Sequence, residues 1–97
     1  MNKEEAAQIL SVELNAFRAK GFAELAELIA DSPLVVERQG ASGAAYQIEV
    51  EVFWDDPKKL NEDLRVMAGI DDGRLLSAFS PLTDSFIVRP DGSFVGE

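Results

Sequence analysis

The clearest pattern in the chain is an alternation of apolar and polar residues over Ala45–Trp54. Successive side chains of a β-strand point to opposite faces of a sheet, so this alternation predicts a strand with one buried face. The side expected to be buried carries Tyr46, Ile48, Val50, Val52 and Trp54. The opposite side carries Gln47, Glu49, Glu51 and Phe53. We therefore expect a sheet that packs on a core with one of its faces.

Near the start of the chain, apolar residues recur at steps of three and four, which is the spacing of one helix face. They are Leu10, Leu14 and Phe17, then Gly21 or Phe22, and then Leu25 and Leu28. Asn2 is a favourable N-cap, and Glu5 follows three residues later, as in a capping box. A cation followed by Gly21 is typical of a helix C-terminus. We therefore predict a helix to about Ala19, a break at Gly21 and a second helix to about Ala30.

The middle of the chain predicts a hairpin and then a further helix. Leu34–Arg38 begins with three apolar residues, and a loop of small residues separates it from Ala45–Trp54, which indicates two antiparallel strands. Two aspartates precede Pro57, an arrangement that is typical of a helix start. The apolar stripe that follows is Leu60, Leu64 and Met67. We therefore predict a helix over Pro57–Ala68, between the second and third strands.

Short apolar segments between turn residues predict the remaining strands. They are Arg74–Phe79, Ser85–Arg89 and Ser93–Val95. Pro, Asp and Gly separate the last two and suit a type I turn with a glycine bulge. Residues 1–97 therefore predict a single α+β domain. In it, the N-terminal helix packs on a mostly antiparallel sheet of four or five strands.

The composition removes most catalytic chemistry. The chain has 97 residues and neither cysteine nor histidine, so it lacks thiolate nucleophiles, the commonest general base and the commonest transition-metal ligands. Two acidic doublets, Asp55-Asp56 and Asp71-Asp72, carry oxygen atoms that suit Ca²⁺ or Mg²⁺. A helix start and a turn account for both doublets without a metal. We therefore expect no catalytic residue, no cofactor and no metal, in a protein that is not an enzyme.

The charge is strongly negative, because 18 acidic residues oppose 9 basic ones and give a formal net charge of −9. Nucleic acids are bound through basic surfaces, so we expect no nucleic-acid partner. No apolar run approaches the roughly 18 residues of a membrane span, and the polar N-terminus is unlike a signal peptide. We therefore expect a cytoplasmic protein without a membrane partner. Its acidic surface would steer a basic partner protein toward it.

Apolar residues are also expected on the acidic side of the sheet. Phe53 shares the side of Glu49 and Glu51, and later strands add Ile87 and Val95. A sheet covered by helices on one face needs only one apolar face, so this second patch is expected to meet a cover. Three covers are open: the predicted middle helix, a second copy in a homodimer, or another protein. We therefore expect an interaction surface there, in a homodimeric protein that also binds another protein, as an inhibitor- or immunity-like protein or as an assembly subunit.

An alternative is a small-molecule-binding domain or minor enzyme with a pocket between helix and sheet. An anionic ligand would then be held by Arg65, Arg74 or Arg89. The segment Phe17–Leu25 leading into Ala30–Val36 resembles the helix–break–helix–strand entry of NTF2-like domains, and the cystatin-like folds are similar in outline. The resemblance implies an α+β architecture. It contains no functional motif and therefore implies no particular activity.

Overall fold

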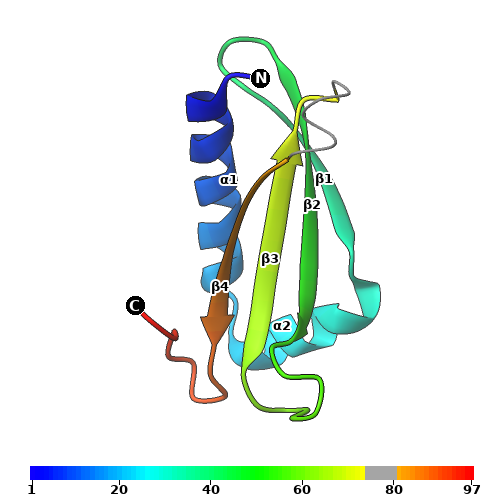
Figure 1. The fold of residues 1–97 in the computed structure, drawn as a ribbon, viewed down its shortest axis with the longest axis vertical. Helices are drawn as coiled ribbons and strands as arrows, with labels where there is room; N and C mark the ends of the chain where they lie inside the picture. Colours follow the sequence, from blue (N-terminus) through cyan, green and yellow to red (C-terminus); the bar gives the residue numbers. More distant parts are fainter. Residues whose placement is uncertain (74–80) are drawn as a thin grey trace.

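The chain forms a four-stranded antiparallel sheet with helices on one face (Figure 1). This computed structural model describes residues 1–73 and 81–97. The elements are, in chain order, α1 (Lys3–Arg18), α2 (Phe22–Leu28), the 3₁₀ turn η1 (Ile29–Asp31), β1 (Leu34–Gln39), β2 (Ala45–Trp54), β3 (Leu64–Asp71) and β4 (Leu82–Val88). The predicted α+β fold, with an N-terminal helix on an antiparallel sheet, is confirmed. Neither helix in the described part of the chain is long and apolar enough to cross a membrane.

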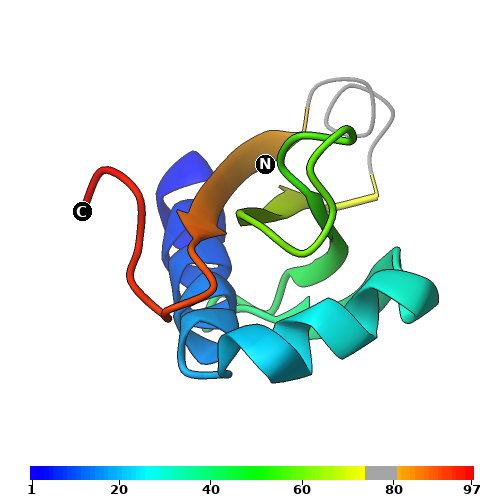
Figure 2. The ribbon, with the colours of Figure 1, turned by 90° about the horizontal axis from the view of Figure 1, so that it is seen from below.

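The N-terminal helices begin and break where the sequence predicts. The Asn2 side chain accepts a hydrogen bond from the backbone N–H of Glu5 at 3.1 Å, which caps the first turn of α1. After Arg18 the helix ends, and Gly21 precedes α2 with an extended backbone. α2 then runs roughly perpendicular to α1 across its lower end (Figure 2). The break lets Leu25 reach the core from a second direction.

Each strand pairs with its neighbour in sequence, so the sheet order is β1-β2-β3-β4. Val50 of β2, for example, lies opposite Leu34 of β1 and Ala68 of β3. Exposed and buried residues alternate along β2 from Ala45 to Val52, as the sequence predicts. We call the sheet side that carries Val50 and faces the helices the inner face, and the opposite side the outer face.

The helix predicted over Pro57–Ala68 is wrong. The chain after β2 enters a loop, where Asp56 Oδ1 accepts a hydrogen bond from the Lys58 N–H at 2.9 Å and makes a turn instead of starting a helix. The next segment is β3, in which every second residue is buried: Leu64, Val66, Ala68 and Ile70. This period of two, completed by pairing with β2 and β4, outweighs the helical spacing of Leu60 and Leu64.

The predicted C-terminal strands are confirmed in part. The strand predicted over Arg74–Phe79 lies outside the described residues. The strand predicted over Ser85–Arg89 forms as β4, but it starts three residues earlier and ends one residue earlier. The strand predicted over Ser93–Val95 is an isolated bridge between Val88 and Phe94. The turn residues that precede it bring the tail back against the end of β4, where it is too short for a ladder.

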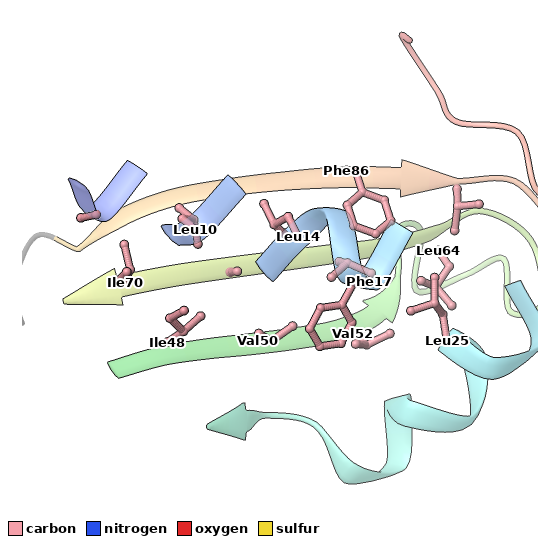
Figure 3. Close-up of a cluster of buried hydrophobic side chains, with 14 of the residues drawn as sticks. Leu10, Leu14, Phe17, Leu25, Ile48, Val50, Val52, Leu64, Ile70 and Phe86 are labelled. Atoms are coloured by element: carbon pink, nitrogen blue, oxygen red, sulfur yellow. The ribbon is translucent and has the colours of Figure 1, made fainter. Parts of the chain in front are cut away.

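The core lies between the helices and the inner face (Figure 3). α1 packs over β3 and β4, whereas α2 packs against β2. The largest side chains that are fully shielded there are Leu14, Leu25, Ile48, Leu64, Ile70, Val50, Val52 and Val66. At the C-terminal end of β4, the rings of Phe86 and Phe94 meet edge to face at 5.6 Å. The tail therefore closes one end of the core.

Candidate functional site: an acidic sheet face

The outer face carries a group of carboxylates that strand pairing brings together. Gln47 of β2 lies between Glu37 of β1 and Asp71 of β3, and Glu49 and Glu51 follow along β2. These residues alternate with inward-facing neighbours, so their side chains project from the same side of the sheet. We call Glu37, Glu49, Glu51 and Asp71 the acidic patch.

The acidic patch is not neutralised by cations in the described part of the chain. Its three glutamates are exposed and form no ion pair with any described residue. Asp71 accepts a hydrogen bond from the Gly73 N–H at 2.8 Å. Arg65 is the cation that faces outward on the four strands, and it is held by Asp55 at 2.9 Å and Ser85 at 3.3 Å. The patch therefore keeps a negative potential that favours a cationic partner.

A shallow groove of about 230 Å³ runs through the acidic patch. It is lined by Glu49, Glu51, Met67, Gly69, Asp71, Pro81 and Thr83. Gly69 lies between Glu49 of β2 and Thr83 of β4 and contributes no side chain, which leaves the groove open at that point. Met67 beside it is 38% exposed. An apolar floor edged by carboxylates suits a lysine or arginine side chain, which combines an aliphatic stem with a cationic head.

The interaction residues predicted from the sequence fall into two groups. Glu49 and Glu51 lie in the acidic patch. Phe53 and Ile87 also face outward, but the strand register places Arg65 between them. Val95 lies in the C-terminal tail, where its N–H donates to the Ile87 carbonyl at 2.9 Å. A charged side chain therefore divides the apolar surface that the sequence predicts as continuous.

Sequence reasoning missed three residues of the outer face: Glu37, Met67 and Asp71. The helix predicted over Pro57–Ala68 assigns Met67 to a helical stripe and leaves Asp71 in a turn, so neither is expected beside β2. The signal that could have found them is the alternation of buried and open positions along β3. Glu37 follows three consecutive apolar residues, which show no alternation from which its face could be assigned.

A second polar cluster joins α1 to the β1–β2 hairpin. The capping-box pattern predicts that the Glu5 carboxylate turns back to its own N-cap. It instead accepts hydrogen bonds from the Ser42 hydroxyl at 2.6 Å, the Ser42 N–H at 3.0 Å and the Tyr46 hydroxyl at 2.7 Å. These bonds favour the charged carboxylate, so the pKa of Glu5 lies below its ordinary value, with the Ser42 hydroxyl as the largest cause. The bond to Glu5 in turn raises the pKa of Tyr46.

Gly40 makes this cluster possible, because a Cβ atom at position 40 would overlap the Glu5 carboxylate. The Gly40 N–H donates to the Ala44 carbonyl at 2.8 Å and closes the end of the hairpin. A larger residue at position 40 would push the carboxylate away from Ser42 and Tyr46. The cluster therefore fastens the first turn of α1 to the hairpin, and its role is structural.

We expect Glu5→Gln to lower the urea midpoint at neutral pH, and we expect this loss to shrink in acid. A carboxylate whose pKa is lowered by folding stabilises the folded state fully above its unfolded value, near 4.5 for glutamate. That stabilisation is lost as the pH falls through the lower, folded value. Urea unfolding between about pH 3 and pH 7 measures the effect, with Glu4→Gln in the same exposed first turn as the control. A loss that stays constant with pH would exclude a role for the charge of Glu5.

A larger groove, of about 380 Å³, lies between α1 and the end of β1. It is lined by Glu5, Gln8, Ile9, Val12, Glu13, Arg38, Gln39, Gly40 and Ala41. Val12, on the α1 side, is 70% exposed. The middle of the space between α1 and the sheet is filled by buried side chains, among them Leu10, Leu14 and Phe17. The groove at the edge of the sheet is therefore the candidate for the pocket that the sequence predicts between helix and sheet.

The arginines expected to anchor an anionic ligand do not line this groove. Arg65 is paired with Asp55, and Arg89 donates to the Ser93 hydroxyl at 3.3 Å. Arg74 lies outside the described residues. Arg65 is therefore held by residues beside its strand, and Arg89 by a residue of its own turn.

Comparisons with known proteins point to no family. The chain matches no protein-family model, no curated protein and no solved structure. The resemblance to NTF2-like domains is therefore confined to the order of helix, break, helix and strand at the start of the chain, which the structure does contain. Architecture of this kind does not define an activity, so function rests on the chemistry of the surface.

Proposed function

We propose that this chain is a non-enzymatic interaction module that binds a basic surface of another protein through the acidic patch. The observation that carries the proposal is the set of uncompensated carboxylates on the sheet face opposite the helices. Val35 and Met67 add exposed apolar area on the same face, at 57% and 38% exposure. The charges steer a basic partner and select it, while the apolar contacts lengthen the lifetime of the complex.

A basic protein suits this face better than a second copy of the chain does. Two copies joined through the outer face would oppose their carboxylates, and each carries a formal charge of −9. A basic partner would relieve that repulsion, as an inhibitor does when it shields a basic enzyme surface or as a subunit does in an assembly. We place the interaction in the cytoplasm, because a chain without cysteine suits a reducing compartment.

Affinity capture from the native lysate tests the proposal, with elution across a salt gradient and identification by mass. We expect a stoichiometric partner with a basic surface that is released at moderate salt, because the Debye length falls to about 10 Å at 0.1 M. Recovery of a second copy alone would favour the homodimer instead. A partner that stays bound at high salt, or no partner, would contradict docking through the acidic patch.

A second candidate function is the binding of a small molecule in the groove between α1 and β1. Its volume lies in the range of ligand sites, and Ile9 and Val12 give it an apolar wall. A thermal-shift screen tests this function, since a ligand that binds the folded state raises the melting temperature by mass action. We expect a true ligand to perturb the amide signals of Ile9 and Val12 and to leave those of the acidic patch unchanged.

A further inference from the structure

β1 lies at an edge of the sheet, and the hairpin fixes which of its backbone groups are free. The Gly40 N–H donates to the Ala44 carbonyl, and the bonds of an antiparallel pair alternate from that point. The backbone groups of residues 34, 36 and 38 therefore face β2. Those of Val35, Glu37 and Gln39 face away from it, and all three residues are exposed. β1 thus presents a row of backbone donors and acceptors to which a further strand can pair.

The two sides of this edge differ in chemistry. On the inner side lies the groove with Ile9 and Val12 on its α1 wall. On the outer side, Val35 and Glu37 continue directly into the acidic patch, opposite Glu49 and Gln47. Because side chains of a strand alternate between faces, a strand laid along β1 would meet an apolar surface with one set and a negative surface with the other.

We propose that β1 accepts an extended segment of the basic partner as an added strand. Its apolar side chains turn into the groove between α1 and β1, and its lysine or arginine side chains turn toward Glu37. The inference rests on the proposed function and specifies how one segment of the partner binds. Main-chain hydrogen bonds supply affinity in this mode of recognition, and the alternating side chains supply specificity.

One contact of the free protein must change when the segment binds. The Arg38 guanidinium donates to the outward carbonyl of Glu37 at 2.9 Å and also pairs with Glu13 of α1 at 2.8 Å. An incoming strand replaces the first of these bonds with its own N–H. Glu13 and Arg38 both line the groove between α1 and β1, so their ion pair forms part of the surface that the segment meets. Arg38 therefore covers one acceptor of the edge until a strand arrives.

Charge favours a basic segment over a second copy of β1. Pairing two identical strands antiparallel brings Glu37 close to its own counterpart, and like charges that face each other across strands are destabilising. The single cation of β1 is Arg38, which is already engaged by Glu13. A segment that alternates apolar and basic residues avoids the repulsion at Glu37 and brings its own free cations.

Two synthetic peptides of one composition test the inference on the isotope-labelled full chain. In the first, lysine and valine alternate; in the second, the lysines form one block and the valines another. We expect the alternating peptide to bind at least about tenfold more tightly, since only it can combine ladder hydrogen bonds with both surfaces. We also expect it to shift the amide signals of Val35, Glu37 and Gln39 and to slow their hydrogen exchange.

Comparing Glu37→Pro with Glu37→Ala separates the contribution of the backbone N–H to peptide binding from that of the carboxylate. Both remove the carboxylate, but only proline removes the outward N–H, which the β1–β2 ladder does not use. We expect Glu37→Pro to bind the alternating peptide about tenfold more weakly than Glu37→Ala does. If the proline variant unfolds, the wild type still tests strand addition. The alternating peptide should then slow hydrogen exchange at the three edge amides.

Three results would overturn the inference. The first is equal binding of the two peptides, or binding that leaves the three edge amides unshifted. The second is a shift confined to Glu49, Glu51 and their neighbours, which would reject strand addition and leave docking at the acidic patch intact. The third is concentration-dependent protection of the edge amides in the free protein, which would assign the edge to a second copy. Failure of the proposed function itself would appear separately, as salt-insensitive capture of the partner.

Discussion

Val50→Asp is expected to unfold the domain. Val50 is fully buried in the middle of the sheet, between Leu34 and Ala68, and the core around it consists of hydrophobic side chains. An unpaired carboxylate there costs about 4 kcal/mol or more. A domain of this size has roughly 5–15 kcal/mol of stability in total. Circular dichroism with heat or urea unfolding at neutral pH should show that the cooperative transition is lost or strongly shifted.

Glu51→Lys is the matched control, because it changes charge one residue away on the opposite side of β2. Glu51 is exposed, so the free energy of unfolding should change by no more than about 0.5 kcal/mol. Val50→Ala removes volume without adding charge and should cost about 2 kcal/mol while the transition stays cooperative. A folded Val50→Asp beside an unfolded Glu51→Lys would mean that β2 is displaced by one residue.

The double substitution Glu49→Lys/Glu51→Lys is expected to abolish capture of a basic partner. It reverses two of the four charges of the acidic patch, both on the β2 side of the groove that passes Gly69. Attraction toward a cationic surface then becomes repulsion, and affinity at low salt should fall by about a hundredfold or more. Titration of the captured partner against wild type and variant, at low and at high salt, measures the loss. The difference should narrow as salt rises, because screening weakens both attraction and repulsion.

A control with the same net charge is available on α2. Glu24 and Glu27 are exposed there, so Glu24→Lys/Glu27→Lys changes the total charge equally but leaves the acidic patch untouched. We expect this variant to keep most of the affinity. An equal loss in both variants would show that total charge, and not the acidic patch, controls binding. Urea unfolding of the two variants confirms that each remains folded.

Elements set by local chemistry are the ones that the sequence predicts well. The break at Gly21, the cap at Asn2 and the bounds of β2 all follow from neighbouring residues, and all three are confirmed. The placement of Glu49 and Glu51 on the side opposite the core follows from the same alternation. This is why half of the acidic patch could be predicted before the fold was known.

Elements set by distant contacts are the ones that the sequence misses. The apolar residues of β3 satisfy a helical spacing when Leu60 is included, and pairing with β2 on one side and β4 on the other decides the outcome. Asp71 joins the acidic patch only through that pairing. In the same way, Glu5 has a local partner in its capping box, but Ser42 and Tyr46 from the hairpin bind its carboxylate instead. No local pattern contains that information.

The order in which the chain is synthesised differs from the order in which its core can be completed. α1 is made before the sheet, yet its apolar stripe packs over β3 and β4, the last two strands. The β1–β2 hairpin can close on its own while translation continues, because each strand pairs with its neighbour in sequence. α1 must wait, with Leu10, Leu14 and Phe17 uncovered, until β4 leaves the ribosome. We therefore expect the nascent chain to be most prone to aggregation while β4 has not yet emerged.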